Sequence, residues 1–193
     1  MVELVPGADL RRRGHRPAAA LTQSVELLLD RAAEAAVRQE WASLHEAGLP
    51  SELRPAGSDS HRPHLTLYAG ESIPPDVDLA LSDLVADLDL AVVLGALTLF
   101  GPHRDRYVLV HQVVPSGELL ALQTRVAEVC GAGAGSHFGA GRWTPHVTLA
   151  RRVRGAELPD LLHVLAGCSA VDHPVRVTRC RRWDSVERRT WLL

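Results

Sequence analysis

The sequence contains no lysine, and this absence excludes one common kind of phosphate site. Residues 131–141 form a glycine-rich stretch whose spacing superficially suggests a phosphate-binding loop. The stretch lacks both the GxGxxG pattern and the lysine of a P-loop, and the residues after it have the pattern of a strand rather than a helix. We therefore interpret residues 131–141 as a flexible loop between two regular elements.

Cysteines and long apolar runs are also scarce. The three cysteines are an odd number and show no CxxC or Cys/His spacing, which argues against both a disulfide framework and a zinc site. No apolar run approaches the roughly 18 residues that indicate a transmembrane helix. The apolar segment 17–21 is too short for the core of a signal peptide. We therefore expect a cytoplasmic protein that does not enter a membrane.

The net charge is only −2, so the molecule as a whole does not have the charge of a polyanion-binding protein. The charge is unevenly placed, however, because ten arginines and only five acidic residues follow position 141. This basic C-terminal part is either a surface for a small phosphorylated ligand or a solvated arginine face, and the sequence leaves both open. The content of 46% hydrophobic and 23% charged residues is that of an ordinary globular protein.

The hydrophobic periodicity predicts alternating strands and helices after a flexible lead-in at residues 1–17. Strands are expected at residues 21–29, 64–68, 90–100, 107–114, 144–150, 171–183 and 189–193, and helices at 31–47, 76–90, 116–130 and 157–166. The order is βαβαβ followed by βαβαββ, which indicates two similar halves. We therefore predict an α+β fold in which residues 18–193 form one bilobal, duplicated βαβ-type domain, with two helix-covered sheets facing a central cleft.

One short pattern occurs twice, once in each predicted half. Residues 63–67 read Pro-His-Leu-Thr-Leu, and residues 145–149 read Pro-His-Val-Thr-Leu. From the composition, about 0.03 matches to Pro-His-x-Thr are expected by chance. Because alternate residues of a strand point to the same face, His64 and Thr66 share one face, and His146 and Thr148 share one in the second half. Each motif therefore carries an imidazole and a hydroxyl side by side on an apolar strand.

This arrangement suits the cleavage of a phosphodiester. The reaction needs a base on one side of phosphorus and an acid on the other, and two imidazoles with ordinary pKa values of about 6.5 can divide these tasks. The threonine hydroxyls can donate hydrogen bonds to the non-bridging oxygens. We expect the side chains of His64 and His146 to lie roughly 5 to 8 Å apart across a cleft. No HxH pattern and no His/Asp cluster is present, so no metal and no cofactor is expected.

The two motifs resemble those of the 2H phosphoesterase superfamily, and most closely its bacterial 2′-5′ RNA ligase-like branch, also described as RNA 2′,3′-cyclic phosphodiesterases. The resemblance implies a bilobal fold, catalytic roles for His64 and His146, and phosphate binding by Thr66 and Thr148. In this branch the second motif often continues to an arginine, here Arg151, which is the candidate for a further phosphate contact. The implied activity is a metal-independent hydrolysis of a 2′,3′-cyclic phosphate at an RNA end or on a small cyclic nucleotide.

Few aromatic side chains can stack on bases, since aromatic residues make up 4% of the chain, and this argues against a long RNA substrate. Tyr68 follows Thr66 at strand spacing and is the candidate for stacking on a base, whereas Trp143 is expected in the core. Two other interpretations stay open. The chain could be a non-catalytic module that binds nucleotides or RNA ends in the same cleft, or a protein-interaction domain that uses its basic C-terminal half. As an enzyme, the chain is expected to act as a monomer.

Overall fold

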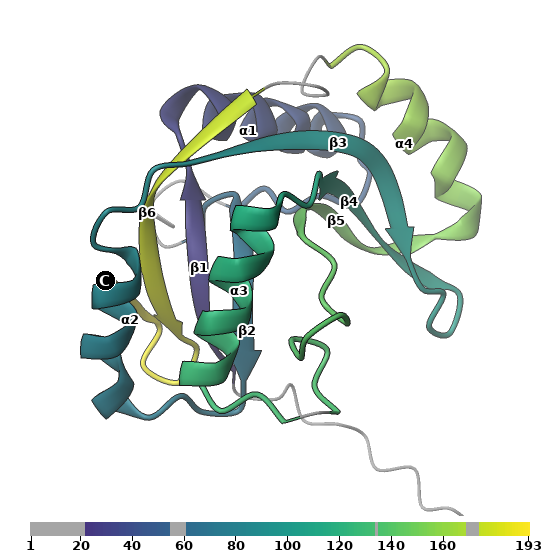
Figure 1. Ribbon diagram of the computed structural model, residues 1–193. Helices are drawn as coiled ribbons and strands as arrows, with labels where there is room; N and C mark the ends of the chain where they lie inside the picture. Colours follow the sequence, from purple (N-terminus) through teal and green to yellow (C-terminus); the bar gives the residue numbers. More distant parts are fainter. Residues whose placement is uncertain (1–21, 55–60, 134, 169–173) are drawn as a thin grey trace, which may run out of the picture.

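The computed structural model describes residues 22–54, 61–133, 135–168 and 174–193 (Figure 1). The strands are β1 (Gln23–Leu29), β2 (His64–Gly70), β3 (Leu90–Phe100), β4 (Arg106–Val113), β5 (His146–Arg154), β6 (Pro174–Asp184) and β7 (Arg189–Leu192). The helices are α1 (Arg31–Glu46), α2 (Asp78–Val85), α3 (Gly117–Val129) and α4 (Leu158–Leu165), with 3₁₀ turns at Pro75–Val77 and Gly155–Glu157. The predicted order of elements is confirmed, and the lead-in predicted for residues 1–17 lies outside the described residues. No helix in the described ranges combines the length and the apolar character that a membrane crossing requires.

The strands pair antiparallel throughout and form one sheet in the order β1-β2-β5-β4-β3-β6-β7. β1 also pairs with β6, so strands β1 to β6 form a closed ring of pairings. The predicted α+β class is confirmed. The two predicted sheets are not observed, because hydrogen bonds join the strands of the two predicted halves into one sheet. β6 is 11 residues long and pairs with β1, β3 and β7, and the single pair Leu65–Val147 joins β2 to β5.

The helices pack in two pairs, α1 with α4 and α2 with α3 (Figure 1). α1 contacts β5, and α3 contacts β2. The two strands that carry the motifs therefore pack against helices of different pairs. The apolar residues of the two motifs have no exposed surface: Leu65, Leu67, Val147 and Leu149. Burying one such side chain stabilises the fold by about 1.5–3 kcal/mol, and a strand shifted by one residue would lose this burial. The apolar residues therefore fix which face of β2 and β5 carries the histidines.

Local sequence signals set the helix boundaries. Asp30 caps α1, since its carboxylate accepts a hydrogen bond from the backbone N–H of Ala33 at 2.9 Å. Ser116 caps α3 in the same way through the N–H of Leu119 at 3.1 Å. α2 ends at Val85, earlier than the predicted end, because the chain turns directly afterwards and enters β3.

Candidate active site

The two motifs meet where β2 and β5 pair, at Leu65 and Val147. In an antiparallel pairing, the residues that flank a matched pair also lie opposite each other. His64 is therefore opposite Thr148, and His146 is opposite Thr66. Opposite residues share a face of the sheet, hence the four polar side chains lie on one face. The two histidines are diagonal neighbours across the pair, a relation for which about 7–8 Å is typical.

Burial follows the predicted alternation along both motifs. The leucines and the valine on the rear face are fully buried, whereas both histidines and both threonines are half-buried. The structure therefore brings the four predicted polar residues together on one half-open face, backed by the core.

Two tryptophans that lie outside the motifs donate hydrogen bonds to the motif strands. The indole N–H of Trp143 donates to the carbonyl of Thr66 at 3.0 Å, and that of Trp41 on α1 donates to the carbonyl of Thr148 at 3.0 Å. Each motif threonine is thus held through its backbone by an equivalent bond. The sequence did not reveal these bonds, because the helical spacing of Trp41 marks it as a core residue and says nothing of an acceptor 107 positions away.

A backbone carbonyl fixes the tautomer of each motif histidine. Nδ1 of His64 lies 2.7 Å from the carbonyl oxygen of Arg62, and Nδ1 of His146 lies 2.8 Å from that of Thr144. Because a carbonyl oxygen only accepts hydrogen bonds, Nδ1 carries the hydrogen in both rings. Nε2 is then the nitrogen at which each ring takes up or releases a proton.

A buried carboxylate distinguishes the surroundings of His64. Oε1 of Glu26 on β1 lies 3.6 Å from Nε2 of His64, and Oε2 pairs with Arg181 at 2.8 Å. Burial raises the pKa of Glu26, but the positive charges of His64 and Arg181, with hydrogen bonds from Ser24 and Arg181, leave this pKa below its usual value. Glu26 therefore stays charged, and its carboxylate lies beside Nε2 of His64.

His146 has the opposite surroundings. Burial lowers its pKa, and the positive charges of Arg151 and His64 add to this, against a smaller opposing effect of the hydrogen bond with Thr144. The ring of Phe100 makes an edge-to-face contact with His146, with the centroids 4.8 Å apart, and adds apolar surface. The neutral form of His146 is thus favoured at neutral pH.

The lowered pKa of His146 predicts that mild acid weakens the fold. Below the ordinary pKa of 6.5, the unfolded chain binds a proton that folded His146 does not, so stability falls until the pH reaches the folded-state pKa. Burial also lowers the pKa of His61, which adds to the same trend. We expect the free energy of unfolding in urea to fall from about pH 7.5 to about pH 5.5, and to fall less in His146→Gln. An equal fall in that variant would contradict the lowered pKa.

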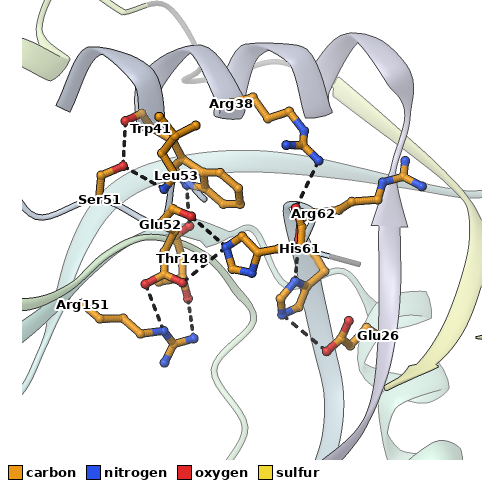
Figure 2. A network of polar contacts seen from close by, with 11 residues as sticks. Glu26, Arg38, Trp41, Ser51, Glu52, Leu53, His61, Arg62, Thr148 and Arg151 are labelled. Atoms are coloured by element: carbon orange, nitrogen blue, oxygen red, sulfur yellow. Dashed lines mark hydrogen bonds and ion pairs between the residues drawn. The ribbon is translucent and has the colours of Figure 1, made fainter. Parts of the chain in front are cut away.

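Arg151 lies beside the second motif, where the sequence predicted it. Its Nη2 is 3.4 Å from Oγ1 of Thr148, and its Nε is 3.4 Å from Oε1 of Glu52 (Figure 2). Glu52 is buried, and its backbone N–H donates to the carbonyl of Leu149 at 3.0 Å, which places this segment along β5. The sequence did not single out Glu52, because it lies in a stretch rich in Pro, Ser and Gly that reads only as a loop.

Tyr68 lies away from the four polar residues. Thr66 and Tyr68 are two positions apart on β2, but they pair with consecutive residues of β1. The register between the two strands therefore shifts at Leu67. This irregularity breaks the alternation, and Tyr68 is only 8% exposed, with its ring centroid 5.6 Å from that of Phe138. The ring therefore has no free face for the base stacking that was predicted. Phe100, which the sequence did not single out, contacts the motif histidine His146.

Within the described ranges, no group of three or more His, Cys, Asp or Glu side chains is placed to hold a metal ion. Burial raises the pKa of Cys130 to about 11 and that of Cys180 to about 12, so both are protonated thiols at neutral pH. The groups placed around the two motifs are imidazoles, hydroxyls, the guanidinium of Arg151 and the carboxylate of Glu26.

Solved structures of known proteins share this fold. The chain is similar to E. coli LigT in its apo form, with a TM-score of 0.52 and 16% identity over 90% of this chain and 94% of that one. It is similar to Usb1 of Kluyveromyces marxianus with a TM-score of 0.52 and 13% identity over 92% of this chain and 100% of that one. At such identities the likeness concerns the fold alone. A search of curated protein sequences finds no significant match.

The sequence family gives the more specific result. The sequence profile of the 2′-5′ RNA ligase superfamily matches residues 29–189, a range that contains both motifs. The resemblance to 2H phosphoesterases that the motifs indicated is therefore confirmed. With this match over most of its length, the chain belongs to the 2′-5′ RNA ligase superfamily.

Proposed function

We propose that this protein is a metal-independent phosphodiesterase that hydrolyses 2′,3′-cyclic phosphates at RNA ends or on small nucleotides. The placement of two histidines and two threonines on one half-open face, around the Leu65–Val147 pair, carries this proposal. E. coli LigT has been crystallised in complex with 3′-AMP, in a structure with a TM-score of 0.52 to this chain, and this supports a nucleotide as the ligand.

The different surroundings of the two rings divide the work between them. Nε2 of His146, which is favoured in the neutral form, accepts a proton from water while the water oxygen attacks phosphorus. The bond between phosphorus and the 3′ oxygen breaks, and that oxygen takes a proton from Nε2 of His64, which lies 3.6 Å from the carboxylate of Glu26. The products are a 2′-phosphate and a 3′-hydroxyl. The two rings then return to their starting states by proton exchange with solvent.

Thr66, Thr148 and Arg151 are assigned to the non-bridging oxygens of the phosphate. The two hydroxyls share a face with the histidines, and donors fixed at this position stabilise the charge that develops in the transition state. The guanidinium of Arg151 adds a positive charge beside Thr148, and Glu52 orients it from the rear.

Replacing Arg151 by alanine should weaken substrate binding more than it slows the chemical step. A contact to phosphate made equally in the ground state and the transition state raises KM when it is lost, with little change in kcat. Loss of one hydrogen bond to a charged group corresponds to a rise of about 10-fold to 100-fold in KM. Steady-state kinetics on a nucleoside 2′,3′-cyclic monophosphate measures this, with Arg152→Ala as the neighbouring control. An unchanged KM in Arg151→Ala would remove this residue from the site.

The activity itself is tested by incubating the protein with a nucleoside 2′,3′-cyclic monophosphate in the presence of EDTA. We expect release of the nucleoside 2′-phosphate, identified by chromatography against the 2′ and 3′ standards. Binding of the nucleotide without any turnover would instead favour the non-catalytic binding module.

A further inference from the structure

A hollow of about 400 Å³ lies where α1, β6 and the segment before β2 meet. The residues that line it are Arg31, Glu34, Ala35, Arg38, Arg62 and Arg179. Four guanidinium groups therefore surround this space together with one carboxylate.

The single carboxylate of the hollow is already shared between two of the arginines. Glu34 accepts hydrogen bonds from Nε of Arg38 at 2.9 Å and from Arg62. Burial raises the pKa of Glu34, but these two partners outweigh burial and leave the pKa lowered. Arg31 and Arg179 are exposed and, within the part of the chain that the structure describes, have no carboxylate within ion-pair distance. The hollow thus holds an uncompensated positive charge with free N–H donors.

The hollow lies beside the first motif on the face that carries the histidines. Arg179 on β6 is opposite Leu28 on β1, and Leu28 is opposite His64 on β2. Opposite residues of antiparallel strands share a face, so Arg179 and His64 point to the same side. Two strand spacings put their backbones about 10 Å apart. Arg62 is closer still, since its carbonyl accepts the hydrogen bond from Nδ1 of His64.

The charge of the hollow also extends along α1. Arg38 reaches from α1 to the segment before β2, where Nη2 donates to the carbonyl of His61 at 3.1 Å (Figure 2). Its guanidinium is thereby held next to that of Arg62, to which Glu34 also binds. Arg38 and Arg62 are thus fixed in place, whereas Arg31 and Arg179 are exposed.

We propose that this hollow binds a backbone phosphate of the nucleotide that precedes the cyclic end. The inference rests on the proposed function and specifies its substrate: an oligoribonucleotide that ends in a 2′,3′-cyclic phosphate, in preference to a mononucleotide. When the cyclic phosphate lies between the two histidines, the next phosphate along the strand is one nucleotide away, within reach of the side chain of Arg179, whose backbone is about 10 Å from that of His64. Recognition through phosphate also agrees with the scarcity of aromatic residues, because arginines bind the backbone without stacking on bases.

The test compares two substrates with the same cyclic end. kcat/KM is measured for a tetraribonucleotide that ends in a 2′,3′-cyclic phosphate and for the corresponding mononucleoside. The double variant Arg31→Gln/Arg179→Gln should lower the value for the tetranucleotide about 10-fold or more, mainly through KM, and leave the mononucleotide unchanged. The salt dependence of oligonucleotide binding should also become shallower, by about 0.7 in log–log slope for each lost phosphate contact. Arg125→Gln, an exposed arginine on α3, is the matched control.

An equal effect of the double variant on both substrates, or no effect on either, would overturn the assignment of the hollow. A second measurement separates this result from failure of the proposed function. Binding of a tetranucleotide with a terminal 3′-phosphate, followed by fluorescence anisotropy, requires no turnover. If the wild type cleaves neither substrate, the proposed function fails, yet weaker binding in the double variant than in Arg125→Gln still supports the hollow. Equal binding in these two variants would refute it.

Discussion

Replacing either His64 or His146 by alanine should lower kcat/KM for a nucleoside 2′,3′-cyclic monophosphate by a factor of roughly 10² to 10⁴. In the proposed mechanism each ring moves one proton from its own side of the phosphate, so neither ring performs both transfers. The double variant should lose little more than either single variant, since the two rings act as a unit. Steady-state rates of the three variants and the wild type give the comparison.

The matched control for this result is His163→Ala, because His163 is exposed on α4 and away from both motifs. Its rate should equal that of the wild type. Thermal unfolding of each variant shows whether the fold is retained. Single variants that kept the wild-type rate, or a double variant whose loss equals the product of the two single losses, would contradict paired acid and base roles.

Replacing Thr66 or Thr148 by valine should lower kcat by a factor of about 10² to 10³, the usual effect of removing one donor to a developing negative charge. Valine keeps the branched shape that suits a half-buried strand, so the change removes the hydroxyl with little effect on the fold. KM should change much less than kcat, because the donated bond strengthens in the transition state. The measurement is the same steady-state assay.

Thr124→Val on α3 serves as the control for the threonine variants, since the hydroxyl of Thr124 donates to the carbonyl of Leu120 in its own helix. If Thr66→Val and Thr148→Val both turned over substrate like this control, the hydroxyls would have no part in stabilising the transition state. A rise in KM with unchanged kcat would instead assign them to ground-state binding.

The polar face of each motif could be predicted from the sequence because it depends on local geometry alone. The two-residue period of a strand places His64 with Thr66 and buries the neighbouring Leu65, whatever the rest of the chain does. The order of helices and strands follows from similarly local patterns. Only the proximity of the two motifs had to be inferred, from their repetition in two similar halves.

The charged groups around the histidines could not be predicted, because they depend on pairings between distant positions. Glu26 lies in the otherwise mostly apolar strand β1, and its partner Arg181 follows 155 positions later. A single acid in such a strand gives no sign of the histidine that it will face. The proposed acid and base assignment therefore depends on contacts that the register of β1, β2 and β6 sets.

Two other expectations did not agree with the structure for reasons of strand geometry. The duplicated pattern predicts two sheets, but a strand as long as β6 pairs with both groups of strands and joins them. The spacing of Tyr68 predicts the face of Thr66, but an irregularity at Leu67 turns the tyrosine into the core. Neither the length of a pairing nor a bulge has a clear signal in a single sequence.

The most direct measurement of the central claim is turnover of a nucleoside 2′,3′-cyclic monophosphate by the wild type, His64→Ala and His146→Ala with EDTA present. We expect the wild type to form the 2′-phosphate at the same rate with and without the chelator, and both variants to be slower by the factors given above. Loss of wild-type activity in EDTA, or wild-type rates in both variants, would contradict metal-free catalysis by two histidines.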